Sequence, residues 1–513
     1  MAVVAIVALA QGHWSLAVPD QGRVGGALVG AGAEQELAGA SGGLRERALA
    51  DTAQWAQRQF GSVDLGDKRR NRRAVEVAAR IAQAPEASLP KRMQSHAQVD
   101  GAYRLLSNPE VSMEALLEPH RQQTLEAARR EPLVLLLEDS SELDYTKHRK
   151  MRGLGPIGDG RGRGLVMHET LALVPGPTKE RARLLGLACF QVVLRTPAAQ
   201  KRSKPADTPE SRLWQESARQ VGQPPEGVRW IHVSDCGSDG FEYMIACVQQ
   251  GKGFVIRSYQ DRRLASEEEA GADSEASAVH LHEYAASLEP REGIAYTVAV
   301  KATKRQPARE ATVVVSWGRA RLVPPRKSGP LGKEHGPLDV RVVRAWEKEP
   351  PEGAKVVQWL LLTTEPVETG AEALRIIDWY GLRWWCEDFH KCLKSGCSVQ
   401  RAQLDRADDI RRLLGILAPV SVRLLQLRQA ARVTPDRPAE EVVEPLMLRV
   451  LCLHQKLPTT KMTIREFFRR VAQLGGFLGR KCDGEPGWQT LWGGYEKLVG
   501  LTEGARLALG TSS

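Results

Sequence analysis

The order of strand-like and helix-like segments between residues 132 and 257 most constrains the fold of this chain. Leu133 to Leu137 is unbroken apolar sequence, too short and too closely bounded for a helix, and it predicts a buried strand. The segments that follow are predicted as strands at 168–174 and 183–195, a helix at 209–221, a strand at 228–234, a helix at 240–249 and a strand at 253–257. The chain therefore predicts a mixed α/β core in which the first three strands precede any helix.

Two of these strands end at an aspartate. Asp139 follows the first strand and Asp235 follows the fourth. Open sheets place their chemistry at such strand ends, although a single Asp there is more often a cap or turn residue. Glu138 points to the other side of its strand, so Asp139 is the preferred acid. The order, with Asp on the first and fourth strands, is that of the ribonuclease-H-like fold.

The stretch from Asp378 to Lys394 is predicted to form one helix of about four turns. At about 100° per residue, Tyr380, Arg383, Glu387 and Lys394 share one narrow face. A carboxylate, two cations and a phenol suit a phosphodiester held beside a metal, and the alternative is a solvated face with ion pairs. The spacing resembles the Tyr-Arg-Glu-Lys signature of DDE cut-and-paste transposases from bacterial insertion sequences and composite transposons.

A basic segment near the N-terminus predicts a DNA contact. Asp67 can cap a helix whose first turns carry five cations, namely Lys68, Arg69, Arg70, Arg72 and Arg73. Cations at a helix start are unfavourable for the macrodipole, and DNA would relieve that repulsion. The alternative is a surface helix paired with acids elsewhere. The segment resembles the end-recognition helix of the same transposases, which implies DNA-end recognition by Arg69, Arg70 and Arg73.

The 152 positions between Asp235 and Glu387 predict an inserted antiparallel β subdomain. Its strand-like segments are 295–300, 311–317, 319–323, 340–346 and 356–363. Trp359 lies 21 residues before Tyr380. The resemblance implies that Trp359 receives a base flipped out of the terminal DNA, whereas the residue pattern alone favours an ordinary core tryptophan.

The whole chain is thus predicted as α/β (α+β): a ribonuclease-H-like mixed-sheet core with an inserted antiparallel β subdomain, between helical N-terminal and C-terminal domains. The predicted parts are 1–43, a disordered tail or start-site extension; 44–115, helical and binding DNA ends; 116–260, the first part of the core; 261–365, the β insertion; 366–430, core helices with Glu387; and 431–513, a helical C-terminal domain. The resemblance implies that this last domain makes a homodimer.

Charge and cysteine usage bound the partners and the compartment. A formal charge of +10 and a pI near 9.2 favour a polyanion, here double-stranded DNA as transposon ends and target, although a ribosome-bound or membrane-surface protein would show the same balance. The eight scattered cysteines predict reduced thiols in a bacterial cytoplasm, with the protein at the nucleoid when it binds DNA. The apolar run Ala2 to Ala10 is too short for a membrane span. No membrane partner and no small-molecule substrate are expected.

The resemblance also implies the chemistry. Asp139, Asp235 and Glu387 would hold two Mg²⁺ ions, with Mn²⁺ as a substitute, because hard oxygen ligands select such cations. Arg383, Lys394 and Arg257 would bind backbone phosphates, and Tyr380 would donate a hydrogen bond to one. Water would nick the end, the freed 3′ hydroxyl would attack the opposite strand to form a hairpin, water would reopen the hairpin, and the 3′ hydroxyl would finally join target DNA. The alternatives are a metal-dependent nuclease without strand transfer and an inactive DNA-binding derivative.

Two features qualify this interpretation. Cys236 follows the second Asp, where the family commonly has Arg, and this departure from the family pattern is expected to weaken a phosphate contact. A zinc site is a second possibility, because Cys386, His390, Cys392 and Cys397 are crowded together. Cys392 would lie about 200° from His390 around a helix, which favours metal-free thiols.

Overall fold

The computed structural model describes residues 16–17, 52–93, 95–195, 209–265, 279–291, 294–300, 307–354, 356–433, 435–441, 443–458, 461–480 and 485–509. The predicted tail at 1–43 therefore lies outside the described residues, except for Leu16 and Ala17. In the described part of the chain, none of the helices combines the length and apolar character that crossing a bilayer requires.

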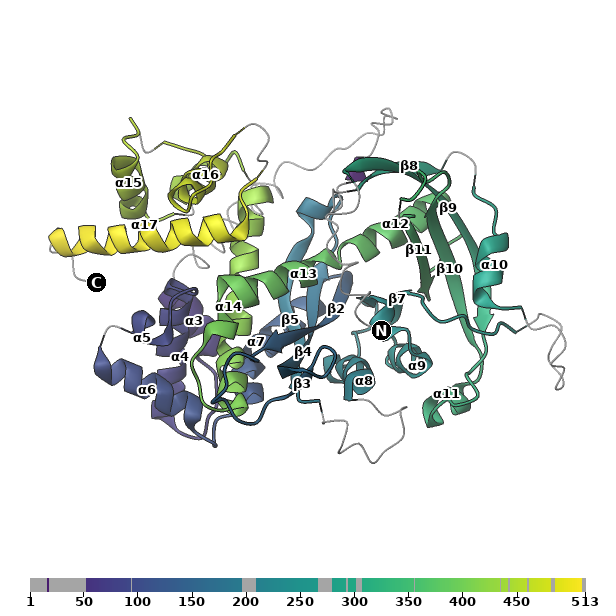
Figure 1. The fold of residues 1–513 in the computed structure, drawn as a ribbon, viewed down its shortest axis with the longest axis horizontal. Helices are drawn as coiled ribbons and strands as arrows, with labels where there is room; N and C mark the ends of the chain where they lie inside the picture. The colour runs from purple at the N-terminus through teal and green to yellow at the C-terminus, as the bar shows by residue number, and fades with distance from the viewer. Residues whose placement is uncertain are drawn as a thin grey trace.

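One mixed sheet runs through the molecule (Figure 1). Its core strands are β2 (Leu133–Asp144), β4 (Gly162–Val174), β5 (Arg183–Val193), β6 (Arg229–Ser234) and β7 (Gly253–Arg257). They lie in the order β5-β4-β2-β6-β7; β2, β6 and β7 are parallel, while β4 is antiparallel to β2 and to β5. Helix α8 (Pro209–Val221) precedes β6 and α9 (Phe241–Gln249) follows it. This topology confirms the ribonuclease-H-like core.

The insertion extends this sheet. Strand β11 (Gln358–Thr363) pairs antiparallel with β7, and β10 (Leu338–Glu347), β9 (Arg309–Leu322) and β8 (Ala295–Val300) continue outward from it, each antiparallel to the next. The two-residue strand β1 (Leu16–Ala17) pairs with β8, and β3 (Gly155–Ile157) pairs with β4 at the other side. The predicted antiparallel pairing is confirmed, but the two segments predicted at 311–317 and 319–323 form a single strand, β9.

The two faces of the sheet carry different helices. On β2, Leu135 and Leu137 belong to one buried cluster together with residues of α12 (Gly370–Gly381), α13 (Trp384–Lys391) and α14 (Ala407–Val433). Val134 and Leu136 belong to another, which includes Trp230 and residues of α7 (Met113–Arg129). Helices α8 and α9 pack against each other on the side of Trp214, Phe254 and Ile256. Side chains at odd positions of β2, including Asp139, therefore face α13.

The N-terminal helices form a bundle beside the sheet (Figure 1). They are α3 (Thr52–Phe60), α4 (Lys68–Gln83), α5 (Leu89–Arg92) and α6 (His96–Ser107), followed by α7. Asp67 caps α4 as predicted, because its carboxylate accepts hydrogen bonds from the backbone N–H groups of Arg69 (2.7 Å) and Arg70 (3.2 Å). The bundle buries Trp55, Phe60 and Ile81.

The 27-residue helix α14 joins the parts of the molecule. It packs on α4, α6 and α7 of the N-terminal bundle, on β5 of the sheet and on α16. The C-terminal helices are α15 (Pro445–His454), α16 (Ile464–Leu474) and α17 (Trp488–Ala508), which surround a small core around Leu451, Phe467 and Leu498. Thr463 caps α16 as part of a capping box with Glu466.

Candidate active site

Asp139 lies in the middle of β2, two residues beyond the last pair that β2 forms with β6. That pair is Leu137 with Val233, and Asp235 lies two residues beyond Val233 on the other strand. The prediction that β2 ends at Asp139 is wrong, because β2 continues to Asp144 in antiparallel pairing with β4. It is the parallel partner strand, β6, that ends near this level, at Ser234. Both aspartates therefore lie where the parallel half of the sheet stops, on the face covered by α13.

Asp235 ends β6 and begins a short 3-10 turn, where its carboxylate accepts a hydrogen bond from the Gly237 N–H (2.8 Å). It is half-buried. Burial, followed by the negative charge of Asp139, raises the pKa of Asp235 above its ordinary value. Two carboxylates that repel each other in one site favour a bound cation.

Glu387 lies in α13, but the signature segment is not one regular helix. Helix α12 ends at Gly381, and the turn before α13 is tightened by hydrogen bonds between residues three apart, such as Arg383 N–H to Tyr380 C=O (3.1 Å). After α13, residues 392–396 form a π-helical turn closed by Cys397 N–H to Cys392 C=O (2.8 Å). The prediction of a single helix over 378–394 is therefore wrong. Gly381 weakens the helix at the first break.

Arg383 links two of the three predicted acids. Its guanidinium donates to Asp139 Oδ2 (2.6 Å) and lies 3.8 Å from Glu387 Oε1. Burial alone would raise the pKa of Asp139, but the charges of Arg383 and His390 hold it below its ordinary value. Asp235 interacts electrostatically with both Asp139 and Arg383. Arg383 thus contacts Asp139 and Glu387 and interacts electrostatically with Asp235.

The other predicted phosphate-binding residues border this cluster. Lys394 lies in the π-helical turn and donates to Ser141 Oγ (2.6 Å), two residues along β2 from Asp139. Tyr380 is half-buried, and burial raises its pKa although the charges of Arg383 and Arg257 oppose this. Arg257 is the last residue of β7, and its positive charge opposes the rise in the pKa of Asp235. The face that carries Asp139 is therefore lined with positive charge.

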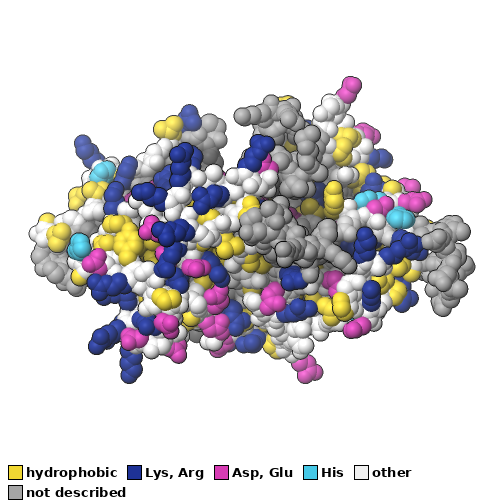
Figure 2. Space-filling model, turned by 60° about the horizontal axis from the view of Figure 1, so that its bottom comes forward, with side chains coloured by type: hydrophobic (Ala, Val, Ile, Leu, Met, Phe, Trp, Pro, Cys, Tyr) yellow, Lys and Arg dark blue, Asp and Glu magenta, His cyan; other side chains and the backbone are white. Residues whose placement is uncertain are grey.

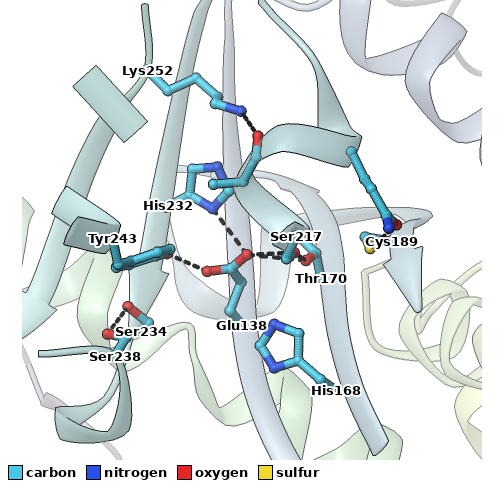
Figure 3. Close-up of polar contacts among 12 residues, drawn as sticks. Glu138, His168, Thr170, Cys189, Ser217, His232, Ser234, Ser238, Tyr243 and Lys252 are labelled. Atoms are coloured by element: carbon cyan, nitrogen blue, oxygen red, sulfur yellow. Dashed lines mark hydrogen bonds and ion pairs between the residues drawn. The ribbon is translucent and has the colours of Figure 1, made fainter. Parts of the chain in front are cut away.

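Glu138 faces the opposite side of β2, as predicted, and its surroundings were not expected from the sequence. The fully buried carboxylate accepts hydrogen bonds from Ser217 (2.8 Å), Thr170 (3.1 Å) and Tyr243, and it lies 3.1 Å from His232 Nδ1 (Figure 3). Burial alone would raise the pKa of Glu138, but His232 and its other partners bring it to about 2. Its oxygens are fully engaged, which leaves Asp139 as the acid available to a ligand.

A second acid next to Asp139 was missed. Glu169 on β4 stands directly opposite Asp139 in the β2–β4 ladder and is fully buried. Its Oε1 lies 2.5 Å from Nε2 of His390, which is on α13 one turn after Glu387. Sequence reasoning considered His390 only as a zinc ligand, and Glu169 stands alone in an apolar strand with no local partner.

The remaining predicted site residues lie outside this cluster. Trp359 on β11 pairs with Ala345 and is half-buried against the large core. Its role in receiving a flipped base stays a prediction. On α4, Arg69 is exposed, Arg70 donates to the Leu65 carbonyl (3.1 Å), and Arg73 pairs with Glu76 (3.1 Å). Lys and Arg side chains crowd the left part of the face in Figure 2, the side on which Figure 1 places α3 to α6.

No group of three or more His, Cys, Asp or Glu side chains within the described residues is arranged to hold a metal ion. The side chains considered as zinc ligands contact different parts of the protein. Cys392 and Cys397 contact Ser421 on α14, whereas His390 contacts Glu169 on β4. The carboxylates of Asp139 and Glu387 instead share the positive charge of Arg383.

Two protein-family models match the ends of the chain. The one described as Transposase DNA-binding matches residues 52–111, which hold helices α3 to α6. The one described as Transposase Tn5 dimerisation domain matches residues 419–513, from within α14 to the end of the chain. Together with the mixed sheet and its helical flanks, these matches support a transposase that binds DNA and forms a homodimer.

Proposed function

We propose that this chain is a DDE transposase, which binds transposon ends, cleaves them through a hairpin intermediate and joins their 3′ ends to target DNA. The observation that supports the proposal is that Arg383 contacts Asp139 and Glu387 and interacts electrostatically with Asp235, on one face of a ribonuclease-H-like sheet. These acids come from three elements that are far apart in sequence. We infer that their shared position on one face of the sheet serves a common function.

The residues present fit a pair of divalent cations in their chemistry. All three donors are carboxylates, which suits Mg²⁺ or Mn²⁺, and the negative charge of Asp139 adds to burial in raising the pKa of Asp235. When bound, two such ions would stabilise the entering and leaving oxygens of a phosphodiester. Asp139, Asp235 and Glu387 would hold them, as proposed ligands.

The cations of this face have a separate role in the proposal. Arg383, Arg257 and Lys394 would hold DNA phosphates, and Tyr380 would donate a hydrogen bond to one of them. Arg383 now pairs with Asp139 and lies near Glu387; burial alone would lower its pKa, but the charges of Asp139, Tyr380 and Asp235 raise it. A planar guanidinium that meets both carboxylates and phosphates is suited to pass from one to the other. Trp359 would receive the flipped base.

The substitution Glu387→Gln tests the catalytic assignment. It removes a proposed metal ligand but no recognition contact, so cleavage should fall by more than about 100-fold while end binding stays within about threefold. The measurements are cleavage and gel-shift assays on DNA carrying the inverted repeats that flank the gene. Loss of binding with cleavage retained would show that the assignment is wrong.

A strand-transfer assay with precut ends and Mg²⁺ separates the three functional alternatives. Joined product supports the transposase, cleavage of uncut ends without joining supports a nuclease, and binding alone supports an inactive DNA-binding derivative. The Glu387→Gln variant is the matched control for background joining.

A further inference from the structure

The contact between Glu169 and His390 has no role in the proposed chemistry, yet it joins α13, which carries Glu387, to β4, the strand that pairs with Asp139 of β2. Glu169 is the cross-strand partner of Asp139, so both side chains leave the same face of the sheet. His390 follows Glu387 by three positions on α13, so their side chains lie on adjoining parts of the helix. The pair therefore fixes α13 above β4 at the level of Asp139.

Burial makes this contact costly to break. The side chain of Glu169 is fully buried and that of His390 is 8% exposed. No other described side chain forms a hydrogen bond with the Glu169 carboxylate, so His390 is the group that compensates it. Burial raises the pKa of Glu169 to about 7, and the charges of Glu169 and Asp139 raise the pKa of His390 despite its burial. Removing either partner leaves an uncompensated polar group inside the protein.

We propose that Glu169 and His390 are positioning residues that hold Glu387 and Asp139 at the separation a bound metal requires. This inference rests on the proposed function. Mutation of residues that orient metal ligands without touching the metal typically lowers metal affinity or activity by about 10–100-fold. The pair is thus expected to affect metal binding in addition to its effect on folding.

A second buried ion pair on α13 provides a matched control. Asp388 pairs with Arg428 of α14, with side chains 13% and 11% exposed. It anchors the same helix to α14 instead of β4. Asp388→Asn should therefore lower the melting temperature about as much as Glu169→Gln, without the specific effect on metal binding.

The test measures Mn²⁺ binding by the electron paramagnetic resonance of free Mn²⁺, in the full-length protein with end DNA. Glu169→Gln and His390→Gln should each weaken Mn²⁺ binding about tenfold or more. The double variant should be little worse than either single one, because both remove the same contact. The Mg²⁺ concentration for half-maximal cleavage should rise in parallel.

The outcomes separate this inference from the function on which it rests. If Glu169→Gln and Asp388→Asn affect Mn²⁺ binding equally at equal loss of melting temperature, the pair is only structural and the inference is wrong. If Glu387→Gln binds Mn²⁺ like the unchanged protein, or the unchanged protein binds none, the metal site itself is wrong. A Glu387→Gln defect without a Glu169→Gln defect overturns the inference alone.

Discussion

At the scale of single residues, Glu138 and Asp139 are neighbours on β2 with opposite surroundings. Glu138 is enclosed by hydroxyl groups and His232, which leaves it no free oxygen for a ligand. Asp139 meets Arg383 and stands opposite Glu169, on the face that α13 covers. The alternation of side chains along a strand separates a structural carboxylate from a proposed catalytic one.

His120 on α7 is a buried histidine whose contacts require the neutral ring. Its Nδ1 lies 2.5 Å from Gln59 Oε1, and its Nε2 accepts the Leu187 N–H (3.1 Å). Burial lowers its pKa from 6.5 to about 4. The unfolded chain therefore binds a proton at this residue between about pH 6.5 and pH 4, where the folded protein does not.

Stability due to His120 should be complete above about pH 6.5 and fall as the pH decreases toward 4, by up to about 3 kcal/mol. The substitution His120→Gln removes this titration. The drop in melting temperature between about pH 7.5 and pH 5 should then be smaller in the variant than in the unchanged protein. An equal drop in both would contradict the neutral assignment of His120.

At the scale of elements, α4 presents its basic start to solvent. Arg70→Ala should weaken end binding and reduce the slope of log affinity against log salt by about 0.9, the value for one lost phosphate contact. Arg80→Ala, near the other end of the same helix, is the control, and its slope should not change. An unchanged slope for Arg70→Ala would remove the start of α4 from the DNA interface.

The strands of the core could be predicted because they are buried on both faces and therefore appear as apolar runs. The end of β2 could not, since residues 139–144 are mostly polar and are held by β4 alone. The two segments predicted at 311–317 and 319–323 leave out Gly318, but β9 continues through it. A Cβ there would lie 2.3 Å from the Tyr284 hydroxyl, so this glycine serves close packing and not a turn.

The candidate site was predicted only in part, for a similar reason. Tyr380, Arg383, Glu387 and Lys394 are close in sequence, so their spacing indicates a shared face even though the helix is broken. The contact of Glu169 with His390 joins residues 221 positions apart and leaves no local pattern. Whether Trp359 receives a base, and which cations the acids bind, stay predictions.

At the scale of the whole molecule, α14 ties the N-terminal bundle to the sheet. Arg412 is 9% exposed and donates to the carbonyls of Val111 (2.6 Å) and Leu106 (3.1 Å), next to Asp409. Arg423, also buried, donates to the carbonyl of Ala82 at the end of α4. The carbonyls of Leu106 and Ala82 lie in the last turns of α6 and α4, where helices leave carbonyl groups unsatisfied, and that of Val111 lies in the loop between α6 and α7.

Arg412→Ala should destabilise the protein by about 2–4 kcal/mol, because it leaves two buried carbonyl groups and Asp409 without their partner. Its neighbour Arg411 pairs with Glu114 at the surface, so Arg411→Ala should cost less than about 1 kcal/mol. Thermal melts and limited trypsin digestion measure the difference. Equal melting temperatures for the two variants would show that Arg412 does not secure the bundle.

The length of α14 also limits how the specificity of this protein can be re-engineered. One face of that helix completes the bundle that carries α4, and its far end lies inside the segment that matches a dimerisation domain. Grafting recognition helices from a homologue would therefore leave mismatched surfaces unless the facing half of α14 is transplanted with them. The boundary of such a chimera must be chosen so that helices that pack on one another are exchanged together, even when they are far apart in the chain.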